Sequence, residues 1–260
     1  MKAALGGGCE GELYLPQGEA PPGAVIVLHE RYGLVQHTLE LAQRLAADGY
    51  VALAPDLFSR WLGDRAALAR GEVRVTLPDD EIAAVIDRAV DFVKPRAERI
   101  ALMGVCQSGR YPVVVGSRRR DLAACVVFYG ASQRRDWEAS ALQPQSMAEM
   151  LPRLNAPALF VFGERDHTIS LDDVRRVRDA LEQGRRSYRM KVFADMPHGW
   201  LNDTMPGRYR PREARAAWEL LLGFLREVFS GAWPGSDRVR WEFESESSPD
   251  YDFAKNVRLE

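Results

Sequence analysis

The chain has no long apolar run and almost no excess of charge. Nothing in its 260 residues approaches the roughly 18 consecutive apolar residues that a membrane-spanning helix requires. The formal net charge of −2 argues against a nucleic-acid partner. Internal repeats and low-complexity segments are also lacking. We therefore expect a globular protein whose partner is neither a nucleic acid nor a membrane.

Cysteine is scarce, with one residue at each of positions 9, 106 and 125. An odd number of scattered cysteines forms neither a disulfide framework nor a cysteine metal cluster, and it is typical of free thiols in a cytosolic protein. The first residues lack the apolar core of a signal peptide. We therefore expect a cytoplasmic protein with free thiols and no bound metal.

Short β-rich runs alternate with longer segments of helical period, which is the pattern of a mainly parallel central sheet with helices on both faces. At this length, with 46% hydrophobic residues, the chain can bury a sizeable core. The sequence thus predicts a single α/β domain over residues 1–229. Its expected strands are 11–15, 24–28, 50–54, 100–104, 124–129, 158–162 and 189–194, and its expected helices include 34–48, 79–93, 171–183 and 211–229.

Cys106 is the most informative residue. It lies in residues 104–109 (GVCQSG), directly after an apolar strand and before a helix. Small residues around a nucleophile at a strand-to-helix turn are typical of a nucleophile elbow, which lifts one side chain above the sheet. The helix N-terminus favours the reactive thiolate. Ser108 occupies the usual place of the second glycine, and a buried structural cysteine is the alternative.

Two further strands end in an acid and a base. Residues 158–162 lead into Asp166, and residues 190–194 lead into His198. The order Cys106, Asp166, His198 is the nucleophile, acid, base order of the α/β-hydrolases. His198 can take the thiol proton and Asp166 can fix the imidazole tautomer. We therefore predict an α/β-hydrolase fold with a Cys-His-Asp triad.

Two insertions, residues 58–77 and 132–152, follow strands whose carboxyl ends should border the active site, so we expect them to form its walls or lid. Residues 230–260 form an acidic C-terminal extension that contains several aromatic residues. A disordered tail is usually poor in aromatics. We expect the extension to dock on its own domain or on a second subunit, with a flexible tail as the alternative.

The sequence resembles the dienelactone hydrolase family, the cysteine-nucleophile branch of the α/β-hydrolases, over about residues 10–229. The resemblance rests on the elbow, on Asp166-His167, and on three segments, residues 29–34 (HERYGL), 54–60 (APDLFSR) and 198–203 (HGWLND). It implies hydrolysis of a lactone or carboxylic ester through an acyl-thioester on Cys106, with no metal or organic cofactor. It also implies that Glu30 contacts the resting thiol and helps it to ionise.

The resemblance and the fold also suggest binding roles. An oxyanion hole would take backbone N–H groups from Gln107 and Arg31. Arg60 matches a family arginine that binds the carboxylate of the dienelactone, with a solvated loop arginine as the alternative. The second such arginine falls at Asn202, which we also expect to bind the substrate. Asn202 supplies no charge, so the sequence favours a less charged ester or lactone.

Two motif aromatics, Tyr32 and Trp200, are expected to contact the substrate. The alternatives are a thiol hydrolase of other activated acyl or phosphoester substrates, or a non-catalytic protein that binds a ligand in the same pocket. The expected partner is a small ester or lactone. The expected oligomeric state is a monomer or a homodimer, which the C-terminal extension could form.

Overall fold

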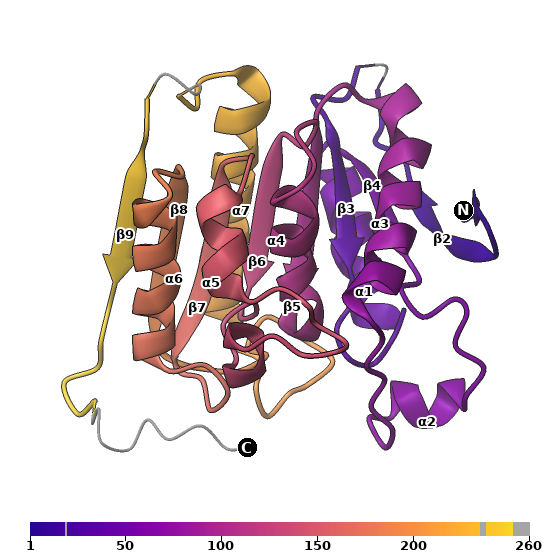
Figure 1. The fold of residues 1–260 in the computed structure, drawn as a ribbon. Helices are drawn as coiled ribbons and strands as arrows, with labels where there is room; N and C mark the ends of the chain where they lie inside the picture. The colour runs from indigo at the N-terminus through magenta and orange to yellow at the C-terminus, as the bar shows by residue number, and fades with distance from the viewer. Residues whose placement is uncertain (19, 235–237, 252–260) are drawn as a thin grey trace.

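The computed structural model describes residues 1–18, 20–234 and 238–251, and in this part of the chain it contains a nine-stranded sheet (Figure 1). The strand order is β1-β2-β4-β3-β5-β6-β7-β8-β9. β2 is antiparallel to β1 and β4, and all other neighbours are parallel. The strands are β1 (Lys2–Gly6), β2 (Cys9–Tyr14), β3 (Ala24–Leu28), β4 (Val51–Pro55), β5 (Ile100–Val105), β6 (Ala124–Phe128), β7 (Ala158–Arg165), β8 (Tyr188–Pro197) and β9 (Trp241–Ser245).

Helices cover both faces of the sheet, as predicted (Figure 1). Their buried side chains join two separate apolar clusters, one on each face. The first face carries α3 (Asp79–Val93), α4 (Arg110–Gly116), α5 (Met147–Met150) and α6 (Leu171–Gln183). The other face carries α1 (Gln36–Ala47) and α7 (Pro211–Ser230), while the short α2 (Arg65–Ala69) lies beyond one end of the strands.

The central strands are buried on both faces because each alternates its side chains between the two clusters. In β3, Ile26 packs into the first cluster and Val27 into the second. The ends of the helices follow local signals. Ser170 caps α6 by accepting a hydrogen bond from the backbone N–H of Asp173, and α7 ends at Gly231, whose φ of +79° suits glycine.

Each predicted strand and each predicted helix range has a counterpart in the structure, with boundaries shifted by up to about three residues. Two strands were not predicted, β1 at the beginning of the chain and β9 in the C-terminal extension. They form the two edges of the sheet. Within the described residues, no helix has the length and apolarity that crossing a membrane requires.

The C-terminal extension lies against its own chain over residues 238–251. β9 pairs in parallel with β8, and Glu242 and Glu244 form ion pairs with Arg189 and Lys191 of that strand. The indole of Trp241 donates to the carbonyl of Arg186 at 3.0 Å. Residues 235–237 and 252–260 of the predicted extension lie outside the described residues.

Candidate active site

The turn that carries Cys106 connects β5 to α4 through a 3-10 turn at Cys106–Gly109. Cys106 has φ = +56°, a left-handed conformation that non-glycine residues rarely adopt. The turn also needs glycine, because a Cβ atom on Gly109 would lie only 2.7 Å from Cα of Gly130. These are the features of a nucleophile elbow.

Ser108 explains how the elbow tolerates a departure from the usual glycine. Its hydroxyl accepts a hydrogen bond from the Val105 N–H at 3.0 Å and donates to the Leu28 carbonyl at 2.8 Å. The side chain is therefore buried with its polar atom satisfied. Gly109, rather than residue 108, is the residue without a side chain that lets the helix approach the neighbouring strand closely.

The structure brings Cys106, His198 and Asp166 together in one hydrogen-bonded line. Cys106 Sγ lies 3.0 Å from His198 Nε2, and His198 Nδ1 lies 2.7 Å from Asp166 Oδ2. Asp166 and His198 follow the adjacent strands β7 and β8, so the sheet itself sets their separation. The arrangement places a thiol, a base and an orienting acid in the geometry that nucleophilic catalysis requires.

The imidazole and the carboxylate support each other's charge. Burial disfavours the charged form of His198, yet Asp166 and Cys106 raise its pKa well above the usual value. Burial likewise opposes ionisation of Asp166, but His198 and the Thr168 hydrogen bonds keep its pKa below the usual value. An imidazolium between Cys106 and Asp166 is thus stabilised from both sides.

Thr168, which we did not predict, orients the acid. Its hydroxyl and its backbone N–H donate to Asp166 Oδ1 at 2.7 and 2.8 Å, and the N–H of Ile169 donates at 3.2 Å. The second oxygen, Oδ2, is left to His198. An acid followed two residues later by threonine is a common local turn, and this spacing could have indicated the contact.

Glu30 lines the same cavity but makes no hydrogen bond to the thiol, which differs from the contact that the family resemblance implied. Its Oε2 accepts a hydrogen bond of 2.6 Å from the side chain of Asn202, and both residues are buried. Among the described residues, the hydrogen-bond partner of the Cys106 thiol is His198.

Asn202 was predicted to bind substrate, and the structure places it elsewhere. It holds Glu30 and accepts two hydrogen bonds from Thr204, so its polar atoms are used internally. Trp200 is also displaced from the predicted role, because its indole is fully buried beside Phe193 and Tyr129 behind the site. Neither side chain lines the cavity.

Arg60 also lies away from the cavity. Its guanidinium is exposed and donates to the carbonyl of Gly7, with Nη2 at 2.6 Å. Gly7 belongs to the turn between β1 and β2, a hairpin that we did not predict, so the motif alone gave the wrong direction for this side chain. Tyr32, by contrast, lines the cavity, as do both predicted oxyanion residues, Gln107 and Arg31.

The cavity above Cys106 has a volume of about 570 Å³, which suits a small-molecule substrate. Both insertions contribute to its walls, as predicted: Arg74 comes from the first, and Gln133, Arg134, Arg135 and Glu138 come from the second. The remaining lining residues include His167, Thr168, Gly199, Met205 and Arg208.

The cavity is strongly cationic. Five arginines line it against two carboxylates, those of Glu30 and Glu138. Arg74, Arg135 and Arg208 make no hydrogen bond or ion pair through their side chains with any residue that the structure describes. Burial and the nearby charges of Arg135 and Arg31 lower the pKa of Arg74. A cluster of unpaired guanidinium groups favours a negatively charged ligand.

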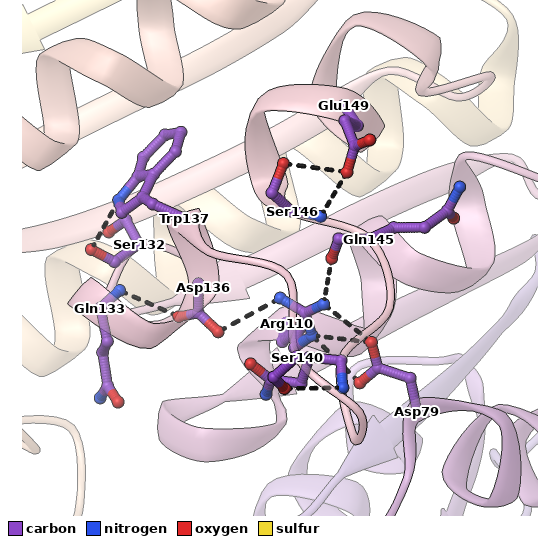
Figure 2. Close-up of polar contacts among 11 residues, drawn as sticks. Asp79, Arg110, Ser132, Gln133, Asp136, Trp137, Ser140, Gln145, Ser146 and Glu149 are labelled. Atoms are coloured by element: carbon purple, nitrogen blue, oxygen red, sulfur yellow. Dashed lines mark hydrogen bonds and ion pairs between the residues drawn. The ribbon is translucent and has the colours of Figure 1, made fainter.

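A buried arginine anchors the second wall to the nucleophile helix (Figure 2). Arg110, in the first turn of α4, contacts Asp79 and Asp136 and donates to the carbonyl of Gln145 at 2.6 Å. Asp136 in turn accepts a hydrogen bond from the N–H of Gln133 at 2.9 Å. The arginine-bearing wall is therefore fixed relative to Cys106 through buried contacts.

Comparison with known proteins identifies the family of the chain. A sequence model of the "Dienelactone hydrolase family" matches residues 9–229. Proteins named "Putative carboxymethylenebutenolidase" from Salmonella typhimurium and Escherichia coli are 29% and 27% identical, covering 82% and 81% of this chain and 82% and 79% of their own.

Solved structures give the same result. A crystal structure described as "Putative Dienelactone Hydrolase" from Klebsiella pneumoniae is 25% identical, with a TM-score of 0.73, over 84% of this chain and 93% of the other. The structure of Est1E from Butyrivibrio proteoclasticus, at 14% identity and a TM-score of 0.65 over 85% and 95% of the two chains, shows the same fold. The chain thus belongs to the dienelactone hydrolase family and is a dienelactone hydrolase-like hydrolase with the α/β-hydrolase fold.

Proposed function

We propose that the protein hydrolyses small esters or lactones that carry a negative charge, through an acyl-thioester on Cys106. The observation that carries the proposal is the line of contacts from Cys106 Sγ to His198 Nε2 (3.0 Å) and from His198 Nδ1 to Asp166 Oδ2 (2.7 Å). This line opens into a cavity lined by arginines.

In the first half-reaction, the Cys106 thiolate attacks the carbonyl carbon and His198 carries the thiol proton. The negative charge on the carbonyl oxygen is met by the backbone N–H groups of Gln107 and Arg31. When the tetrahedral intermediate collapses, the bond to the alcohol oxygen breaks and His198 gives that oxygen its proton. The acyl group remains on Cys106 as a thioester.

In the second half-reaction, water attacks the thioester while His198 takes one of its protons. The carbon–sulfur bond breaks, the acid is released, and the proton on His198 restores the imidazolium beside the Cys106 thiolate. Asp166 stabilises the imidazolium throughout, because it remains hydrogen-bonded to Nδ1.

Glu30 is assigned the role of an auxiliary base for the resting thiol. Its carboxylate lines the cavity with Cys106, and Asn202 occupies only Oε2. Oε1 accepts no hydrogen bond from the described residues, so it is available to a thiol proton or a water.

The arginine lining supports an anionic substrate, contrary to the less charged substrate favoured by Asn202. Arg74 and Arg135 approach the cavity from the two insertions, and Arg208 approaches from the segment after His198. Guanidinium groups bind carboxylates in charge-assisted hydrogen bonds, each contributing about 1.5–3 kcal/mol. The cations of the site thus come from positions other than Arg60 and Asn202.

The test compares kcat/KM for two aryl esters of matched size, one with a free carboxylate on the acyl chain and one with a methyl in its place. Arg74→Gln and Arg135→Gln should each lower the ratio of anionic to neutral kcat/KM by about tenfold or more. Arg60→Gln, an exposed arginine outside the cavity, is the matched control and should leave the ratio unchanged. If the ratio of anionic to neutral kcat/KM is the same in the parent protein and in all three variants, the preference for an anionic substrate is ruled out.

The chemistry itself is tested by mass spectrometry of acid-quenched reactions. An acyl adduct on Cys106 that is absent in Cys106→Ala supports the thioester route. Turnover retained in Cys106→Ala would show that another group performs the attack. Ligand binding without hydrolysis of any ester in the series would instead favour a non-catalytic binding protein.

A further inference from the structure

A buried carboxylate joins the two strands of the triad to the C-terminal extension. Glu164 lies in β7, two residues before Asp166, and its side chain is fully buried with 0% exposure. Its Oε2 accepts a hydrogen bond from the N–H of Asp195 at 2.7 Å, and its Oε1 accepts one from the N–H of Ser248 at 2.7 Å. The Ser248 hydroxyl also donates to Oε2 at 3.0 Å.

These donors lie where β7 and β8 turn toward the active site. Asp195 is three residues before His198 and has φ = +60°. The pairing of β7 with β8 shifts its register between Gly163 and Arg165, so Glu164 lies at a bulge. A bulge re-aims the side chains that follow it. The positions of Asp166 and His198 both depend on this irregular segment.

A second set of contacts, at the surface, also joins β7 to Asp195 of β8 and to the C-terminal extension. Arg165 pairs with Asp195 at 2.8 Å and with Asp250 at 2.8 Å, and it donates to the Ser248 hydroxyl at 3.1 Å. These ion pairs are solvent-exposed and weak on their own. The buried Glu164 carboxylate matters more, because removal of the Ser248 hydroxyl takes one of two donors from Oε2 in the interior, while the backbone N–H of residue 248 still donates to Oε1.

We infer that Glu164 and Ser248 form a clamp that positions Asp166 and His198 for catalysis. The C-terminal extension, which lies beyond the 9–229 segment that matches the family, thereby contributes to the acid–base half of the site. Glu164 and Ser248 are positioning residues, since neither lines the cavity. The inference rests on the proposed function of the triad.

The test measures how fast iodoacetamide alkylates Cys106 as a function of pH, together with kcat and KM for an aryl ester. Both are followed in the full-length protein and in Ser248→Ala and Glu164→Gln. The titratable groups around the imidazole are Asp166, Cys106, His167 and Tyr129. Glu244→Gln is the matched control, because Glu244 ties the extension to Lys191 of β8 without touching Glu164.

A misplaced His198 stabilises the thiolate less well. Both clamp variants should therefore lower the alkylation rate at pH 7 and lower kcat with KM unchanged, by about ten- to a hundredfold in Glu164→Gln and by about tenfold in Ser248→Ala, which loses one hydrogen bond. The alkaline limb of the kcat profile should move to lower pH. Glu244→Gln should show none of these changes, even if its melting temperature falls.

The outcomes separate the two proposals. If wild-type Cys106 is alkylated selectively and both clamp variants retain its pH profile and kcat, the clamp only stabilises the fold and the inference is wrong. If wild-type Cys106 shows no preferential alkylation and forms no acyl adduct, the proposed function fails instead. Ser248→Ala, which removes one hydroxyl, is the informative variant should Glu164→Gln fold poorly.

Discussion

Arg110 and Asp79 form a buried ion pair in which Nη2 and Oδ2 lie 2.7 Å apart and Nε donates to both carboxylate oxygens. The arginine is four residues after the nucleophile, and its guanidinium also contacts Asp136 in the cavity wall. One side chain that is 2% exposed therefore holds α3, the nucleophile helix and the arginine-bearing wall in a fixed arrangement.

The first prediction concerns stability. Asp79→Ala should lower the free energy of unfolding by about 3–5 kcal/mol, because it leaves the Arg110 guanidinium buried with part of its charge uncompensated. Asp80→Ala is the matched control, since Asp80 lies in the same first turn of α3 but is exposed. Urea denaturation provides the measurement. An equal loss in the two variants would show that the effect comes from the helix N-terminus rather than from Arg110.

A second prediction follows from the raised pKa of His198. The imidazolium should persist above its usual range and be lost as the pH rises through that raised pKa, so kcat/KM should fall on the alkaline side. In Asp166→Asn, the charge that raises this pKa is removed, and the alkaline limb should move to lower pH. Turnover should fall by about a thousandfold or more. If the alkaline limb of the kcat/KM profile lies at the same pH in Asp166→Asn as in the parent protein, Asp166 does not set the protonation of His198.

The third prediction compares the thiols. Cys125 is fully buried, and burial raises its pKa to about 12, so it should resist alkylation near neutral pH. Cys9 is also buried. Cys106 contacts His198 and lines the cavity, and it should react first. Peptide mapping after brief treatment with iodoacetamide gives the order. Equal labelling of Cys106 and Cys125 would argue against an activated nucleophile.

The fourth prediction tests the partner of Glu30. Asn202→Asp replaces a donor with a carboxylate at the 2.6 Å contact, so two acids would share a buried site. We expect their repulsion to displace the Glu30 carboxylate from its position in the cavity and kcat to fall relative to the parent protein. Thr204→Val is a control, because it removes a donor to Asn202 but keeps the Glu30 contact. Unchanged activity in Asn202→Asp would remove Glu30 from the mechanism.

Much of the site could be predicted from the sequence because its parts are local. The turn at Cys106 requires small residues within a few positions, and Asp166 and His198 each follow an apolar strand directly. In a parallel sheet, the carboxyl ends of neighbouring strands meet at one edge, so three local motifs suffice to bring three side chains together.

The errors arose where a side chain depends on a distant segment. Arg60 bonds to the turn of an unpredicted hairpin, and Asn202 points inward because Glu30 accepts its hydrogen bond. Arg74 and Arg208 lie in irregular segments and Arg135 lies in a single 3-10 turn (Arg134–Trp137), so no periodicity indicates the direction of their side chains. With 35 lysines and arginines in the chain, nothing local distinguishes these three.

The contacts of Ser248 with Glu164 could not be predicted from the sequence for a similar reason. The extension was expected to dock because of its aromatic residues, but neither its strand pairing nor the Glu164 contact has a local sequence signal. Parallel pairing of β9 with β8 depends on the register between two segments about fifty residues apart.

The left-handed backbone at Cys106 has a consequence for engineering this protein. A non-glycine residue held at φ = +56° costs about 1–3 kcal/mol, which a glycine at the same position would release. Cys106→Gly should therefore resist heat better than the parent while having no turnover. A library selected for thermostability alone would favour loss of the nucleophile, so every round of such a selection has to score hydrolysis as well.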